Sequence, residues 1–195
     1  MSDALEVLSG GGVAAIPTDT VYGLAADPNL AGATRRIFEI KGRPMAMELP
    51  VLVASTEQAS CLAAGSRLPE QARILVERFW PGGLTIVVRR AEGLLWDLGG
   101  NGASIGLRCP AHPVALELCR RAGPLAVTSA NLHGGPPLVT AEAVAACFGS
   151  MVDVVVDAGR CDGVPSTVVG LVSGEPVCIR EGSLPWGEVL ATLEL

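Results

Sequence analysis

Pro17-Thr18-Asp19-Thr20-Val21-Tyr22-Gly23-Leu24 directly follows the apolar run from Val13 to Ile16, and this junction decides how the fold is interpreted. The run predicts a buried strand that stops at Pro17, because proline cannot donate a hydrogen bond to a neighbouring strand. Hydroxyl groups and one carboxylate then crowd the turn. In open α/β sheets, a parallel strand leads at this point into a ligand crevice. The stretch therefore predicts an α/β domain with a binding site just beyond this strand.

A helix is predicted after the turn, and two cationic side chains stand at its end. Ala33, Ile37 and Ile40 recur at helical spacing, and Lys41 and Arg43 follow them directly. Lys41 is the only lysine, so arginine supplies the other thirteen of the fourteen Lys and Arg side chains. A point-charge ammonium two residues from a forked guanidinium is typical of a phosphate clamp. We therefore expect Lys41 and Arg43 to hold phosphate groups.

The composition narrows the class of protein. A chain of 195 residues that is 49% hydrophobic and 17% charged can bury one sizeable core, so we expect a single domain over residues 1–195. A net charge of -6 argues against a protein that coats a polyanion, although a local basic crevice is compatible with it. The six cysteines lack Cys-x-x-Cys spacing and are expected to be small buried hydrophobes in a reducing compartment, without a zinc site or disulfides.

The N-terminal stretch and the apolar runs are not expected to be a signal peptide or a membrane span. The N-terminal stretch holds Asp3 and Glu6 where a signal peptide is basic, and no apolar run is long enough to span a bilayer. We expect a cytoplasmic protein that does not contact a membrane.

The rest of the chain alternates between predicted strands and helices. Ser55 and Thr140 are expected to cap helices, and His112 is expected to be a surface or capping residue at the start of another helix. Apolar runs predict further strands around residues 49–54, 84–89, 103–108, 125–128, 152–156, 167–169 and 177–180. This alternation supports an α/β domain.

Polar side chains stand where several of these predicted strands end. Arg108 ends one strand, and an arginine at a buried strand end needs an anionic partner, which is either a structural carboxylate or a ligand. Ser129 and Asn131 end another strand, where they form either an ordinary hydroxyl-rich turn or part of the crevice. The repeated clustering of polar groups at carboxyl ends of strands favours the crevice.

Taken together, Pro17 to Leu24, the segment Ile37-Phe-Glu-Ile-Lys-Gly-Arg-Pro44 and the later Ser129-x-Asn131 resemble the YrdC-like family of threonylcarbamoyl-AMP synthases, over nearly the whole chain. The resemblance implies a three-layer YrdC-like α/β fold, in which helices flank a twisted mixed sheet with a concave ligand-binding face. It also implies a nucleotidyltransferase that makes threonylcarbamoyl-AMP and pyrophosphate from L-threonine, bicarbonate and ATP, for threonylcarbamoyladenosine modification of tRNA.

The same resemblance assigns roles to individual residues. The family's Lys-x-Arg and Ser-x-Asn pairs hold the nucleotide and correspond here to Lys41, Arg43, Ser129 and Asn131, of which Lys41 and Arg43 are the expected catalytic residues. Ser104 and Arg180 would also contact ATP or the adenylate. L-threonine would be bound by four residues: Thr20, Arg108, Val127 and Ser166.

The implied chemistry requires positioning and charge neutralisation more than a covalent nucleophile, and the sequence offers cations and hydroxyls without a Ser-His-Asp or Cys-His set. Mg2+ is expected on the triphosphate, held mainly by phosphates and water, because no carboxylate cluster suggests a protein cage. Asp19 is expected to be structural. The partners implied are downstream proteins that transfer the threonylcarbamoyl group to tRNA, so that contact with tRNA is indirect.

Two departures from the family pattern leave alternative functions open. Where many relatives have Asn and His after the Arg-Pro pair, this chain has Met47 and Leu52, which changes one side of the expected pocket. The alternatives are an RNA-binding YrdC-like module without catalysis and a carbamoyl-transfer module like that of hydrogenase maturation proteins. The net negative charge of the chain weighs against the RNA-binding module. The second usually works beside zinc-finger and acylphosphatase regions that this sequence lacks.

Overall fold

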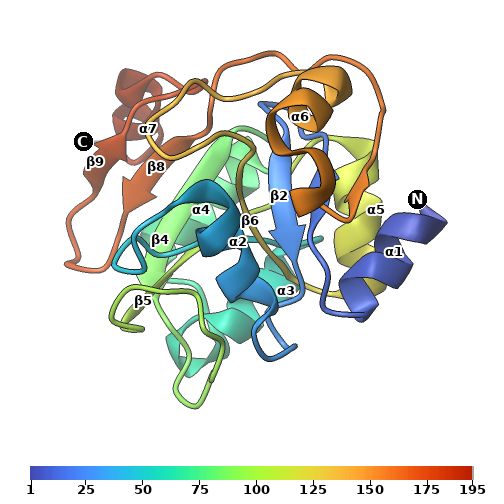
Figure 1. The fold of residues 1–195 in the computed structure, drawn as a ribbon. Helices are drawn as coiled ribbons and strands as arrows, with labels where there is room; N and C mark the ends of the chain where they lie inside the picture. The colour runs from blue at the N-terminus through green and yellow to red at the C-terminus, as the bar shows by residue number, and fades with distance from the viewer. Residues whose placement is uncertain (195) are drawn as a thin grey trace.

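The computed structural model describes residues 1–194, and in these residues nine strands form one mixed sheet. Their order across the sheet is β7-β1-β2-β6-β3-β5-β4-β8-β9. Figure 1 labels strands β2, β4, β5, β6, β8 and β9. The strands are β1 (Ala14–Ile16), β2 (Gly23–Ala26), β3 (Val51–Leu52), β4 (Leu84–Arg89), β5 (Ser104–Arg108), β6 (Leu125–Ser129), β7 (Val154–Val155), β8 (Thr167–Gly170) and β9 (Val177–Arg180). Parallel pairs are β1–β7, β3–β5 and β4–β8, and the other neighbours are antiparallel.

Three of the seven α-helices in residues 1–194 begin at a side chain that caps them. The side chains of Ser55, His112 and Thr140 accept hydrogen bonds from backbone N–H groups at the starts of α3, α5 and α6, as predicted. The α-helices are α1 (Ser2–Ser9), α2 (Ala33–Lys41), α3 (Thr56–Leu62), α4 (Glu70–Phe79), α5 (Pro113–Ala122), α6 (Ala141–Phe148) and α7 (Trp186–Thr192), and the short 3-10 turns are Ala64–Ser66 and Gly149–Met151. Within residues 1–194, no helix is long and apolar enough to cross a bilayer.

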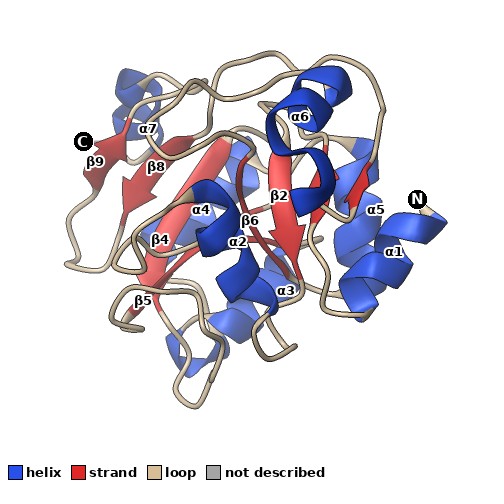
Figure 2. Cartoon of the chain, in the orientation of Figure 1, coloured by secondary structure: helices blue, strands red, loops and turns tan. Residues whose placement is uncertain are grey.

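Strand alternation sends side chains into two separate cores. On one face Val13, Ala15 and Leu24 pack in a large core with helices α2, α3, α4, α6 and α7. On the other face Ala14, Ile16 and Ala25 pack against α1 and α5. Helices thus cover both faces of the sheet (Figure 2), which confirms the predicted three-layer α/β fold with a twisted mixed sheet.

Helices α1 and α5 cover only half of their face. Their core contains residues of β1, β2, β3 and β6 but none of β4, β5, β8 or β9. On β4, for example, Leu84, Ile86 and Val88 belong to the large core, so Thr85 and Val87 point to the side that α1 and α5 leave open. Half of this face of the sheet is therefore left without a covering helix.

One strand was not predicted, and one prediction about the cysteines is wrong. Gly23 to Ala26, for which no strand was predicted, forms β2, an antiparallel partner of both β1 and β6. The segment is short and built of Gly, Leu and Ala, so it has neither alternation nor β-branched residues to mark it as a strand. The prediction that the cysteines are buried holds for Cys109, Cys119 and Cys161 but fails for Cys61, which is exposed, and for Cys147 and Cys178, which are only partly buried.

Candidate functional site

A cavity of about 480 Å3 occupies the uncovered face of the sheet. Its floor contains Leu52, Val87, Gly106 and Val168, and polar side chains stand around them. Eight of the ten residues predicted for the site line it: Thr20, Arg43, Ser104, Arg108, Val127, Ser129, Ser166 and Arg180. Lys41 and Asn131 do not.

The sequence predicted a site along one edge of the sheet, at the carboxyl ends of parallel strands. This prediction is wrong. Leu52 of β3 is level with both Arg108, which ends β5, and Leu125, which begins β6. Because β6 is antiparallel to β3, Ser129 lies at the opposite end of the strands from Arg108. The two residues meet the same cavity because both face the open side of the sheet, so the cavity runs along the strands rather than across their ends.

The turn after β1 is folded over this face by its own hydroxyl groups. Thr18 donates a hydrogen bond to the carbonyl of Val21 (2.7 Å) and accepts from the N–H of Thr20 and of Val21 (3.2 Å each). Its Oγ1 also lies 2.9 Å from Oγ1 of Thr20. Both threonines are buried, so these bonds fix the Thr20 hydroxyl toward the cavity.

Arg108 is held from three sides at this turn. Its guanidinium donates to Oγ1 of Thr20 (2.8 Å) and to the carbonyl of Gly82 (2.9 Å), and its Nη2 lies 2.8 Å from Oδ1 of Asp19. The Nη2 contact is an ion pair without hydrogen-bond alignment, so Nη2 keeps buried N–H groups without an acceptor among residues 1–194. Burial lowers the pKa of Arg108 and the Asp19 carboxylate opposes that shift. The structural alternative for Arg108 is therefore confirmed, because Asp19 is its carboxylate partner. A contact of Arg108 with an anionic ligand stays a prediction.

A second arginine closes the cavity beside β8. Arg180 donates from Nη2 to the backbone carbonyl of Ser166 (2.6 Å) and to its hydroxyl (3.2 Å), and that hydroxyl lies 2.9 Å from Oγ1 of Thr85. Burial lowers the pKa of Arg180, and the nearby charge of Arg108 lowers it further. Two like charges share this end of the cavity, which favours an anionic ligand between them.

Lys41 occupies an unexpected position behind the Ser129–Asn131 turn. Its side chain is 3% exposed, and Nζ donates to the backbone carbonyls of Ser129 and Asn131 (2.5 Å each) and to Oδ1 of Asn131 (3.2 Å). The Ser129 hydroxyl also donates to Oδ1 of Asn131 (2.5 Å). Burial and then the charge of Arg43 lower the pKa of Lys41 to about 8. All three ammonium donors thus support the turn, and a contact of Lys41 with phosphate stays a prediction.

Arg43 is bound to its own loop. Its Nε donates to the carbonyl of Met47 (3.2 Å) and its Nη2 to the carbonyl of Glu48 (3.1 Å), while the side chain lines the cavity. Burial lowers its pKa. These two bonds hold the loop from 43 to 48 in place and present the guanidinium to the ligand space.

Glu48 is the acid on the cavity wall, and the sequence did not single it out. Its Oε2 accepts a hydrogen bond from the Ser104 hydroxyl (3.0 Å), whereas its Oε1 is buried and has no partner among residues 1–194. Burial raises the pKa of Glu48, and the Ser104 bond and the charge of Arg90 act in the opposite direction.

This raised pKa predicts a pH-dependent effect on stability. The folded state binds the Glu48 proton more tightly than the unfolded state does, so ionisation costs stability as pH rises through the folded pKa, and the cost disappears below the ordinary pKa of 4.5. We expect Glu48→Gln to raise Tm at pH 7 and to leave it unchanged at pH 4. Thermal melts from pH 4 to 8 measure this, with Glu175→Gln, a change on an exposed loop, as the control. A Tm difference that does not vary with pH would contradict the assignment.

Two acidic residues at the site, Asp19 and Glu48, were not predicted from the sequence as site residues. Asp19 was expected to be structural; it is that, and it also pairs with Arg108 at the site. Glu48 lies in the segment where relatives have a different pattern, and an acid in an otherwise apolar stretch ending at Leu52 was the available signal. Neither partner could be found from spacing, because Asp19 and Arg108, and Glu48 and Ser104, are far apart in the chain.

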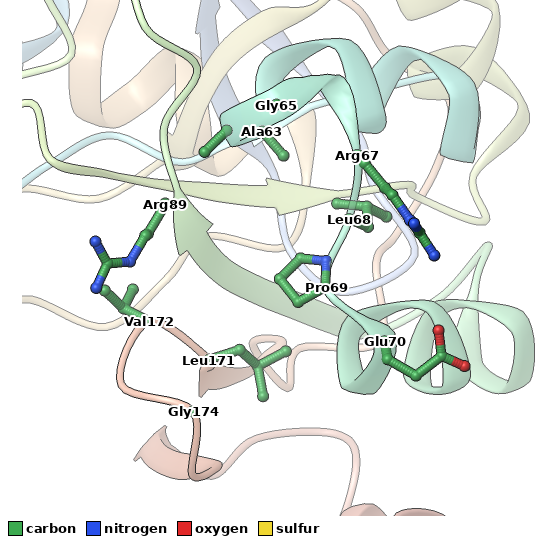
Figure 3. A pocket seen from close by; sticks show the side chains of 11 residues that line it. Ala63, Gly65, Arg67, Leu68, Pro69, Glu70, Arg89, Leu171, Val172 and Gly174 are labelled. Carbon is green, nitrogen blue, oxygen red and sulfur yellow. The ribbon is translucent and has the colours of Figure 1, made fainter.

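The described residues contain no metal-binding cluster, and a second cavity lies away from the predicted site residues. In residues 1–194, no group of three or more His, Cys, Asp and Glu side chains is placed to hold a metal ion. A second cavity, of about 550 Å3, lies between the start of α4 and the end of β4. Arg67 and Arg89 flank it on opposite sides of Leu68 and Leu171 (Figure 3), and none of the ten predicted residues lines it.

Comparison with known sequences identifies the family of this chain. The Sua5/YciO/YrdC family model, described as telomere recombination, matches residues 6–182. A putative threonylcarbamoyl-AMP synthase of Mycobacterium tuberculosis is 41% identical over 180 residues, covering 92% of this chain and 82% of the relative. The threonylcarbamoyl-AMP synthase of Pyrococcus abyssi is 40% identical over 181 residues, but the match spans only 53% of that longer protein.

Solved structures show the same fold. The crystal structure of P. abyssi Sua5 complexed with L-threonine superposes with a TM-score of 0.92 at 38% identity, covering 97% of this chain and 56% of that one. Escherichia coli YciO gives a TM-score of 0.82 at 26% identity, covering 93% of this chain and 88% of that one. With a family match over most of its length and relatives of this similarity, the chain belongs to the Sua5/YciO/YrdC family.

Proposed function

We propose that this protein is a threonylcarbamoyl-AMP synthase that converts L-threonine, bicarbonate and ATP into threonylcarbamoyl-AMP and pyrophosphate, for the threonylcarbamoyladenosine modification of tRNA. One observation carries the proposal. A cavity with three arginines and several fixed hydroxyl groups lies on the open face of a fold that matches the threonine-bound P. abyssi protein. The enzyme would be a nucleotidyltransferase, because AMP is transferred to the carbamate.

The two ends of the cavity suit the two substrates. Near Arg108 and Arg180, guanidinium donors and the hydroxyls of Thr20 and Ser166 would bind the carboxylate and hydroxyl of L-threonine, with the backbone near Val127. Arg43, Ser129 and Ser104 line the remaining wall and would hold ATP, supported by Lys41 and Asn131 behind the turn.

The reaction is balanced by these reactants alone. The threonine amine combines with bicarbonate to form a carbamate and water. A carbamate oxygen then attacks the α-phosphorus of ATP, a new P–O bond forms, and the bond to the β-phosphate oxygen breaks to release pyrophosphate. The chain's contribution is to align the carbamate with the phosphorus and to neutralise charge with fixed cations.

Mg2+ would accompany the triphosphate. Because residues 1–194 form no cluster of protein ligands, the ion would be coordinated chiefly by phosphate oxygens and water. Its chemistry would be to neutralise charge on the leaving pyrophosphate. The product would then pass to a separate protein that transfers the threonylcarbamoyl group to tRNA, so that tRNA contact is indirect.

Full-length HypF superposes with a TM-score of 0.78 at 18% identity, which shows a shared fold alone. The RNA-binding alternative is opposed by the net charge of -6.

Pyrophosphate release distinguishes the three functions. We expect release from ATP with L-threonine and bicarbonate together, and background release when either is omitted. Carbamoyl phosphate replacing bicarbonate and threonine as the required substrate would indicate the carbamoyl-transfer module. Tight, steeply salt-dependent binding of RNA without any pyrophosphate release would indicate the RNA-binding module.

A further inference from the structure

The wall formed by Glu48 and Ser104 joins two segments that are distant in sequence. Glu48 belongs to the loop that Arg43 holds, and Ser104 is the first residue of β5. Gly100 packs directly against Glu48: a Cβ on Gly100 would lie 3.2 Å from Cβ of Glu48, and its φ of +66° is one that side-chain-bearing residues rarely adopt. The carboxylate is therefore held in place by its loop, by Ser104 and by the backbone at Gly100.

The chemistry of this pair fixes the direction of one hydrogen bond. An ionised carboxylate can only accept hydrogen bonds, and a serine hydroxyl has one proton and two lone pairs. Because Ser104 lies 3.0 Å from Oε2 of Glu48, its proton is committed to the carboxylate. The Ser104 oxygen can then offer only lone pairs to the cavity.

We propose that Glu48 is a positioning residue that makes Ser104 a hydrogen-bond acceptor for the ligand, so that the nucleotide group bound at this wall must be a hydrogen-bond donor. This inference rests on the proposed function and deepens it, because it assigns part of the nucleotide specificity to a pair that involves a residue outside the predicted set. The phosphate oxygens of ATP are acceptors and are excluded from this wall. The donors of ATP are the exocyclic amine of adenine and the ribose hydroxyls.

The length of β5 agrees with a nucleoside at this end. Ser104 and Arg108 are the two ends of the strand, and both line the cavity. Four residues of extended strand separate them by about 13 Å. The cationic end near Arg108 would hold threonine, and the acceptor end near Ser104 would hold a donor group on the far side of the phosphates.

Nucleotide analogues identify the donor and test the pair. Calorimetric binding is measured for ATP, ITP, 2′-deoxyATP and 3′-deoxyATP on the wild type, Glu48→Gln, Ser104→Ala and the control Glu175→Gln. ITP replaces the amine with a carbonyl, and each deoxy analogue lacks one ribose hydroxyl. We expect the wild type and Glu175→Gln to bind one analogue at least about tenfold more weakly than ATP, since a lost donor leaves the site's acceptor unpaired.

The two variants are expected to lose that discrimination for different reasons. Ser104→Ala removes the acceptor, so the disfavoured analogue should come within about threefold of ATP. In Glu48→Gln the amide can donate to Ser104 and release its proton toward the cavity. If adenine is the group bound, ITP should then equal or exceed ATP in affinity, a reversal that a loss of structure cannot produce.

The outcomes separate this inference from the proposed function. If ATP binds and pyrophosphate is formed, but Glu48→Gln keeps the wild-type order of affinities, the positioning role of Glu48 is wrong and the synthase assignment stands. Equal affinity of the wild type for all four nucleotides would also overturn it. Failure of the wild type to bind ATP would overturn both proposals. Unchanged far-UV circular dichroism and Tm at pH 4 confirm that each variant is folded.

Discussion

Arg108→Gln is expected to lower kcat/KM for L-threonine by at least about 100-fold, because two or more charge-assisted hydrogen bonds to the substrate carboxylate would be lost, each worth about 1.5–3 kcal/mol. The Arg108 side chain is only 7% exposed, lines the cavity and is held by Thr20, Gly82 and Asp19, so its guanidinium is fixed in place for an anionic ligand. Pyrophosphate release titrated against threonine at saturating ATP measures the effect.

The same substitution is expected to destabilise the fold, since it leaves Asp19 without its partner. Breaking one side of a buried ion pair costs about 3–5 kcal/mol, discounted here because the Asp19 side chain is 19% exposed. The double variant Asp19→Asn with Arg108→Gln removes both charges and should recover much of the lost stability without recovering threonine use. If the double variant regains activity along with its Tm, then Arg108 acts through stability and does not bind substrate. Arg108→Lys, which keeps the charge and loses the fork, should remain impaired.

Lys41→Met is expected to abolish measurable turnover and to weaken ATP binding by about 100-fold. Methionine fills a similar volume but leaves the carbonyls of Ser129 and Asn131 and the Oδ1 of Asn131 without the ammonium donor. Each unsatisfied buried group costs about 1–3 kcal/mol, and the turn that presents Ser129 to the cavity depends on these bonds. Isothermal titration with ATP and single-turnover pyrophosphate release check the two effects.

The pKa of Lys41 adds a pH signature to this prediction. Burial lowers that pKa to about 8, so the side chain is charged at neutral pH and loses its charge as pH rises through that value. Since kcat/KM reports ionisations of the free enzyme, kcat/KM for ATP should fall above about pH 8 in the wild type. The residual activity of Lys41→Met should lack this alkaline limb. Near-normal turnover in folded Lys41→Met, or an identical alkaline limb in both proteins, would contradict a role for the Lys41 charge.

Arg43→Lys serves as the comparison within the same motif. It preserves the positive charge at the cavity but cannot maintain both the Nε bond to Met47 and the Nη2 bond to Glu48. We expect it to weaken ATP binding while leaving the alkaline limb of Lys41 in place.

Local sequence patterns were enough to predict the helix caps, most of the site residues and the fold class. Helix caps at Ser55, His112 and Thr140 were predictable because a cap is a contact between residues two or three apart. Eight of the ten site residues that the family resemblance implies line one cavity, because the motifs around Thr20, Arg43 and Ser129 carry that resemblance. The layered α/β class followed from the alternation of apolar runs.

Only the tertiary structure decided how those residues meet. Arg108 and Ser129 end strands that run in opposite directions, yet share a cavity because α1 and α5 leave half of one face uncovered. The pairs Asp19–Arg108 and Glu48–Ser104, and the place of Lys41 behind its turn, depend on strand order and register. Order and register are set by the packing of side chains distant in sequence, and local propensity and spacing do not encode that packing.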